Sequence, residues 1–304
     1  MKRIVSLSLA ASLFVLPACK GGANAEAVKL VPDEAEMIIG MNPKAITESE
    51  LYKAFGAEIE KEGDFQEAKK TFSDCGLEPN AIEALVVGVK ASSEDFVAVV
   101  AAEGIGKDDT ASCIIKNIQK MNGDEQVADV TKDSGHKIIQ FTDGRAYLVN
   151  DNMLALATTA WETKIGELID GKGTPAIENS KKDLYGKVDT KAAVWFIADV
   201  PSEMAAGAAA VAPEAAKVKS VVGTVDLSKG VALDLLAGFG SGDDATATAD
   251  AAKKAFDEAK GMAALIGLSA AAESVKIEAA GSDVKVTGSI SMDEITALQK
   301  MAAQ

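Results

Sequence analysis

Apolar and polar residues alternate strictly near the end of the chain. Val275 and Ile277, and then Val284 and Val286, occupy every second position, with lysine, glutamate or threonine between them. A period of two is typical of a β-strand with one buried and one solvated face. Two neighbouring strands of this kind predict an antiparallel sheet whose single apolar face needs helices to cover it.

The same order of signals occurs twice along the chain. A strand signal leads to a proline and a helical stretch, two more strands follow, and a Gly-x-Gly turn with two aspartates introduces another helix. The spacing stays at 134–135 residues from Gly88 to Gly223 and from Gly104 to Gly238. The predicted strands are 37–41, 85–89 and 96–101 in the first copy, and 194–198, 221–225 and 231–237 in the second. We interpret this as a duplication.

The two copies also end in the same pattern. A strand at 153–157 leads to Thr159 and Glu162, and a strand at 284–289 leads to Ser291 and Glu294. Both are capping-box patterns, in which the hydroxyl and the carboxylate bind backbone N–H groups at a helix start. The first copy contains an additional predicted hairpin, 137–141 with 146–149.

These patterns predict an α+β fold of two similar units, each a mainly antiparallel sheet covered by helices on one face. The first unit spans 28–170 and the second 188–304. Gly171, Gly173 and Pro175 mark 171–187 as a linker, with a short helix at about 177–185. Whether the two sheets join remains open at this point.

Composition narrows the possible partners. The chain has 31 basic and 46 acidic residues, a net charge of −15, and is 48% hydrophobic but only 5% aromatic. An acidic surface repels phosphates and anionic headgroups, so we expect no nucleic-acid partner. The apolar core is expected to consist mainly of Ala, Val, Ile and Leu, with Trp161, Trp195, Tyr147 and Phe196 as aromatic anchors.

The first residues have the pattern of a secretory signal. Lys2 and Arg3 precede an apolar stretch at 4–16, which is too short to span a bilayer, and Leu16-Pro17-Ala18-Cys19 follows. This ending resembles the lipobox of bacterial lipoproteins. The resemblance implies a signal peptide at 1–18, acylation (palmitate among the chains) at Cys19 and attachment to a membrane through that lipid. Lys20, being other than aspartate, would then indicate the outer membrane.

Residues 19–27 are rich in small residues and are expected to form a flexible tether. An ordinary signal cut near Ala25, which would leave a soluble periplasmic protein, is the alternative. The body, with the openings 31–35 and 188–192, is similar to uncharacterised two-repeat lipoproteins of Gram-negative bacteria, a resemblance that implies no activity.

Two further cysteines, Cys75 and Cys113, could form a disulfide in an oxidising compartment. Cys75 lies at a predicted helix end, and Cys113 on the flank of an apolar helix face. Two small buried thiols are the alternative.

No motif predicts catalysis, a cofactor or a metal site. Gly166–Lys172 has the spacing of a phosphate loop, but it ends a predicted helix where a phosphate loop begins one. His136 is the single histidine, and the aspartate pairs are explained as helix caps and turns. We therefore expect a non-enzymatic envelope protein with a binding or structural role and an unknown envelope protein partner. A carrier of an apolar ligand is the alternative.

Overall fold

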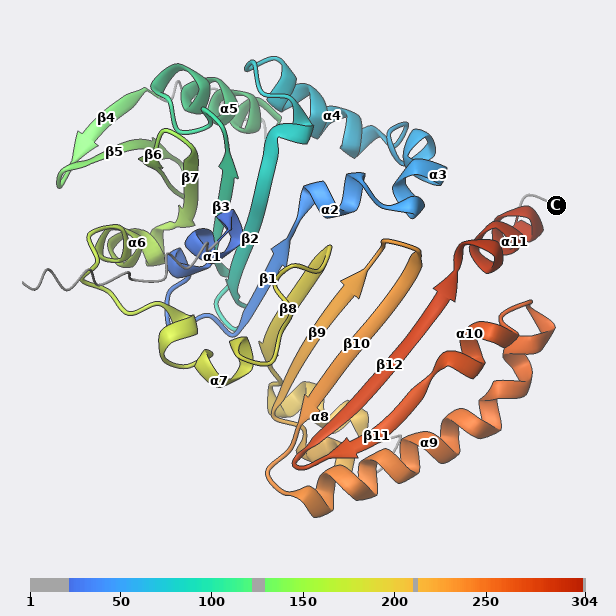
Figure 1. Cartoon of the computed structure of the whole chain (residues 1–304). Coiled ribbons are helices and arrows are strands. Elements are labelled where there is room, and N and C mark those ends of the chain that lie inside the picture. The colour runs from blue at the N-terminus through green and yellow to red at the C-terminus, as the bar shows by residue number, and fades with distance from the viewer. Residues whose placement is uncertain (1–21, 122–128, 210–212, 303–304) are drawn as a thin grey trace, which may run out of the picture.

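A single antiparallel sheet runs through the whole molecule. The computed structural model describes residues 22–121, 129–209 and 213–302, and its twelve strands follow the order β11-β12-β10-β9-β8-β1-β2-β3-β7-β6-β5-β4 (Figure 1). β1 pairs with β8, with Ile39 opposite Phe196, so the two predicted sheets are continuous. The strands are β1 Met37–Met41, β2 Ile82–Lys90, β3 Asp95–Ala102, β4 Val130–Asp133, β5 His136–Phe141, β6 Gly144–Asn150, β7 Met153–Thr158, β8 Val194–Asp199, β9 Ser220–Asp226, β10 Gly230–Gly238, β11 Lys276–Ala280 and β12 Asp283–Ser291.

Helices connect the strands and cover parts of the sheet. They are α1 Ala23–Ala27, α2 Pro43–Thr47, α3 Glu50–Ile59, α4 Gly63–Ser73, α5 Asp108–Met121, α6 Glu162–Ile169, α7 Lys182–Tyr185, α8 Ser202–Ala208, α9 Gly242–Leu265, α10 Ser269–Ser274 and α11 Met292–Ala302. α5 and α4 lie over the first part of the sheet, whereas α9 runs beside β11 at the opposite edge (Figure 1). The predicted mixture of helices and antiparallel strands is confirmed.

Side chains of adjacent residues in β8 define the two faces of the sheet, which we call the Trp195 face and the Phe196 face. Along the row of paired residues that contains Trp195, the side chains of this face change from buried to half-buried between β8 and β9. Trp195 and its neighbours Gly40 and Val86 are buried, but Thr224 and Asp234, next in the same row, are only half-buried. The first part of this face therefore lies inside the protein and the last part lies at its surface.

Short elements cover the buried part of the Trp195 face. α1, the 3-10 turns Val28–Leu30 and Thr159–Trp161, and α6 supply apolar side chains, among them Val28, Trp161 and Ile165, to one buried cluster with Trp195. Gly40 is required here, because a Cβ at this position would overlap the Trp195 ring. The aromatic anchors Trp161, Trp195 and Tyr147 are buried, whereas Phe196 is half-buried.

Helices also cover both ends of the Phe196 face. α5 packs Ile114 and Ile115 on Ile139 and Leu154 at one end. At the other end α9 packs Ala245 and Ala249 on Val284. The first part of the sheet thus has helices on both faces, which corrects the prediction of cover on one face only. The apolar runs of β2, β3 and β7, without polar alternation, are the sequence signal for burial on both sides.

Two segments that were predicted as connections, the linker 171–187 and the flexible tether 19–27, contain residues packed in the core. Within the predicted linker 171–187, Ala176 is fully buried and its N–H donates to the Val31 carbonyl at 2.9 Å. The second half of the predicted tether 19–27 is α1, where Ala27 is fully buried. Both segments contribute to the cluster under Trp195, because small apolar residues fill the space close to the sheet.

The two capping boxes differ in outcome. In the second, the Ser291 N–H donates to Glu294 Oε2 at 3.2 Å and the Glu294 N–H donates to Ser291 Oγ at 3.4 Å, as predicted. In the first, Thr159 begins a 3-10 turn, and the Glu162 carboxylate instead accepts from Gln140 Nε2 at 3.2 Å. A tertiary contact has replaced the local one.

Candidate ligand pocket

An apolar pocket lies beneath the three short helices that follow β1. Its volume is about 480 Å³, within the range of small-molecule sites. Its apolar walls are Pro43, Ile46, Phe65, Ala68, Phe72 and Ile82, and its polar lining is Thr47, Tyr52, Glu60, Lys69, Glu78 and Asn80.

Two helix caps shape this pocket within ten residues of chain. The Asn42 side chain accepts from the Ala45 N–H at 3.3 Å, and Pro43 is the first residue of α2. Ser49, which is buried, then accepts from the Tyr52 N–H at 3.0 Å and starts α3. The chain therefore ends α2 and begins α3 almost at once, which places the Tyr52 ring against the pocket.

Three polar side chains form one end of the lining. The Tyr52 hydroxyl donates to Glu60 Oε1 at 2.7 Å, and Lys69 Nζ lies 2.9 Å from Glu60 Oε2. The Lys69 ammonium, and next the Tyr52 hydroxyl, lower the pKa of the Glu60 carboxyl. The hydrogen bond to Glu60, together with burial, raises the pKa of Tyr52. Glu60 is therefore a carboxylate and Tyr52 a neutral donor at neutral pH.

A disulfide holds the α4 wall of the pocket to α5. Cys75 and Cys113 are joined, with their Cα atoms 5.5 Å apart. Asn117 of α5 adds a hydrogen bond from Nδ2 to the Thr71 carbonyl at 3.4 Å. Within α4, Thr71 is buried, whereas Phe65 and Phe72 are only half-buried. The covalent bond therefore supports a helix that buries little apolar surface of its own.

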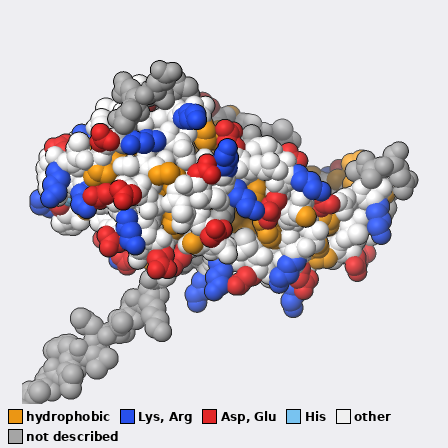
Figure 2. Space-filling view, turned by 90° about the horizontal axis from the view of Figure 1, so that it is seen from above, with side chains coloured by type: hydrophobic (Ala, Val, Ile, Leu, Met, Phe, Trp, Pro, Cys, Tyr) orange, Lys and Arg blue, Asp and Glu red, His pale blue; other side chains and the backbone are white. Residues whose placement is uncertain are grey.

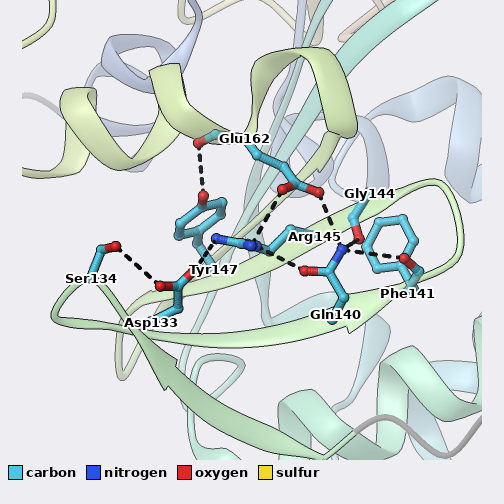
Figure 3. A network of polar contacts seen from close by, with 8 residues as sticks. All are labelled: Asp133, Ser134, Gln140, Phe141, Gly144, Arg145, Tyr147 and Glu162. Carbon is cyan, nitrogen blue, oxygen red and sulfur yellow. Dashed lines mark hydrogen bonds and ion pairs between the residues drawn. The ribbon is translucent and has the colours of Figure 1, made fainter.

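A second polar cluster lies between the β4–β6 strands and α6 (Figure 3). Arg145 pairs with Asp133 at 2.8 Å and with Glu162 at 3.4 Å, and its Nε donates to Gln140 Oε1 at 3.0 Å. Burial raises the pKa of Tyr147, whose hydroxyl donates to the Glu162 carbonyl at 2.7 Å. These groups satisfy one another's hydrogen bonds, so the cluster joins α6 to the sheet.

The His136 side chain is largely shielded from solvent. Its side chain is 15% exposed, its Nε2 lies 3.4 Å from Asp170 Oδ1, and its ring meets the Tyr147 ring edge-on at 5.9 Å. Gly166 packs beside it on α6. Gly171, with φ of 68°, ends that helix, so the Gly166–Lys172 segment is a helix C-terminus and not a phosphate loop.

The structure does not describe all of the residues for which the sequence makes predictions. Cys19 and residues 1–21 lie outside the described residues. In the ranges that the structure describes, no group of three or more His, Cys, Asp or Glu is arranged to hold a metal ion. In the same ranges no helix has the length and apolar character needed to cross a membrane.

The sequence did not predict the pocket. Its lining comes from α2, α3, α4, the start of β2 and the turns that follow α3 and precede β2, and the contacts Tyr52–Glu60 and Glu60–Lys69 join residues eight and nine positions apart. The seven-residue spacing of Phe65 and Phe72 on one helix face was the available signal, and it indicates only an apolar face.

No protein-family model matches the chain, and no curated protein matches it either. Some solved structures do match the chain. A crystal structure titled "Structure of crystal form III of TP0453" is 9% identical, with a TM-score of 0.51 over 90% of this chain and 96% of that one. Crystal form I of TP0453 gives 10% identity and a TM-score of 0.47 over 90% and 95%. At this identity the first likeness concerns the fold alone: the chain shares its overall fold with crystal form III of TP0453.

Proposed function

We propose that this chain is a lipid-anchored, non-enzymatic protein of a bacterial envelope that binds an apolar ligand in the α2–α4 pocket. The pocket carries this proposal, because it combines apolar walls with a few polar groups in a volume of about 480 Å³. The anchor is supported by the resemblance of Leu16–Cys19 to a lipobox. The proposed location is the outer membrane.

Filling the pocket tests the binding role. Ala68 lines the pocket and is exposed, so Ala68→Trp places an indole in the ligand's space without disturbing the core. Ala255→Trp on α9, also exposed and outside the pocket, is the matched control. We expect the wild type and Ala255→Trp to bind the neutral dye Nile red and Ala68→Trp to lose binding. Equal dye binding by all three would contradict the proposal.

Labelling tests the anchor separately. Cells fed radioactive palmitate should label the wild type and not Cys19→Ala, whereas Cys75→Ala should label like the wild type. Unlabelled wild-type protein with a new N-terminus near residue 25 would favour ordinary secretion.

A partner-binding role is a second candidate, and one observation favours it. In the middle of the Phe196 face, Val87, Ile39, Phe196 and Leu235 form an apolar row that is only half-buried. Seen from above, hydrophobic side chains are visible in the middle of the molecule among acidic and basic ones (Figure 2). Crosslinking in intact envelopes, which should capture a specific protein if this role is correct, tests it.

We further propose that the two parts of the sheet are copies of one unit. From the centre outward, the orders β1-β2-β3-β7-β6 and β8-β9-β10-β12-β11 are topologically the same. Superposition of β1, β2, β3, β7 and β6 on β8, β9, β10, β12 and β11 tests this; a better fit with another strand correspondence would contradict it.

A further inference from the structure

The polar end of the α2–α4 pocket indicates what kind of head group its ligand has. Tyr52, Glu60 and Lys69 meet there, while Pro43, Ile46 and the two phenylalanines line the rest. Glu60 and Lys69 are roughly two-fifths exposed, so this end faces the solvent. A ligand that fills the pocket would bury an apolar body and leave one end of the molecule beside these three side chains.

The charges at this end disfavour an anionic ligand. The positive charge of Lys69 is already paired with Glu60, and Glu78 adds a second carboxylate to the lining. Two acids and one base leave this lining with an excess of one negative charge. The net charge of the whole chain, −15, has the same sign. A carboxylate or phosphate head would therefore be repelled both locally and at longer range.

The hydrogen-bonding groups match a hydroxyl. Glu60 accepts one hydrogen bond from Tyr52 and one from Lys69, and its two oxygens have further lone pairs. Lys69 has two ammonium protons that this contact does not use. A hydroxyl can donate to the carboxylate and accept from the ammonium at once, whereas an ammonium head could satisfy only the carboxylate.

We infer that the ligand is an uncharged amphiphile: an apolar chain or ring system that ends in a hydroxyl, with this hydroxyl between Glu60 and Lys69. The inference rests on the proposed apolar-ligand function and adds the class of head group. Glu60 is the residue that determines specificity, because it provides both the acceptor and the negative charge.

Three probes with the same ten-carbon chain test the head group. 1-Decanol, decanoate and decylamine are titrated against the purified protein at pH 8 by displacement of Nile red. We expect 1-decanol to bind about tenfold more tightly than decanoate, because the free energy of one hydrogen bond to a charged group corresponds to a change in affinity of about this size. Decanoate or decylamine binding as tightly as 1-decanol, or more tightly, would overturn the inference while leaving the pocket function intact.

Charge reversal sharpens the same test. Glu60→Lys should change the preference from 1-decanol to decanoate, because the lining then has an excess of one positive charge. Glu58→Lys, in the last turn of α3, exposed and outside the lining, makes the same change in net charge and should keep the wild-type preference. An identical shift in both variants would contradict a local role for Glu60. Failure of all three probes to bind the wild type would reject the pocket function itself, and this inference with it.

Discussion

The two parts of the sheet have similar strand orders but bury different surfaces. From β1 to β7 the Trp195 face lies under helices or short turns, and Val86, Val99 and Ala155, adjacent in one row of this face, are fully buried. From β9 to β12 the equivalent row contains Asp234 and Thr287 and faces the solvent. Sheets with one open face alternate, and sheets covered on both faces do not, so the strand sequences record this difference.

The largest expected effect lies where the two kinds of surface meet. Trp195 is fully buried, whereas Thr224, its neighbour in the same row, is half-buried. Trp195→Ala should lower the free energy of unfolding by about 3–5 kcal/mol, since it leaves a large cavity. Thr224→Ala should lower it by about 0.5 kcal/mol. Urea denaturation followed by circular dichroism measures both.

A milder variant keeps this prediction testable if Trp195→Ala fails to fold. The Trp195 indole N–H is buried and has no hydrogen-bond partner among the described residues. Trp195→Phe therefore removes volume but no hydrogen bond, and we expect a loss between those of the other two variants. A loss no larger than that of Thr224→Ala would show that the covered face is not more tightly packed there.

The disulfide strengthens the first part of the molecule alone. Cys75 and Cys113 are 38 positions apart, and a loop of this length is expected to contribute about 2–4 kcal/mol through the unfolded chain. The Cys75→Ser/Cys113→Ser variant should lose this amount and become insensitive to dithiothreitol, whereas the wild type should become less stable when reduced. Two free thiols in protein secreted to the periplasm would contradict the bond.

The paired capping boxes compare equivalent positions of the two parts. Ser291 caps α11 through its hydroxyl, so Ser291→Ala should cost about 1 kcal/mol. Thr159 forms no such cap, and Thr159→Ala should change the free energy of unfolding by less than about 0.5 kcal/mol. Thermal unfolding of both variants measures the difference; equal losses would show that the sequence pattern and not the observed geometry determines the cap.

The same cap predicts a dependence on pH. The Ala271 N–H, followed by the N–H and hydroxyl of Ser291, lowers the pKa of the Glu294 carboxyl below its ordinary value. A carboxyl with a lowered pKa stabilises the fold above its unfolded pKa, and this contribution is lost as the pH falls through the folded pKa. The difference in urea midpoint between wild type and Glu294→Gln should therefore shrink below about pH 4. A constant difference from pH 7 to pH 3 would contradict it.

Local sequence patterns predicted the helices and strands, whereas long-range contacts determine how these elements pack together. The strands around Leu85–Val89 and Val221–Val225 and the Ser291 cap follow from residues within a few positions of one another. The cover of the Trp195 face does not, because Ala27 and Ala176, which belong to the same buried cluster, are 149 positions apart in the chain. The pocket likewise depends on how α2, α3 and α4 pack, which no periodicity of a single helix specifies.

The smallest expected effect concerns the open face. Lys285 Nζ lies 2.9 Å from Asp234 Oδ2 on neighbouring strands, and both side chains are more than two-fifths exposed. A double-mutant cycle of Asp234→Ala and Lys285→Ala should give a coupling of about 0.2–1 kcal/mol, since solvent screens exposed pairs. In 1 M salt, where the screening length is about 3 Å, the coupling should disappear. A coupling that survives high salt would mean that this face is covered in solution, and the contrast between the two parts of the sheet would then be smaller than the chain alone indicates.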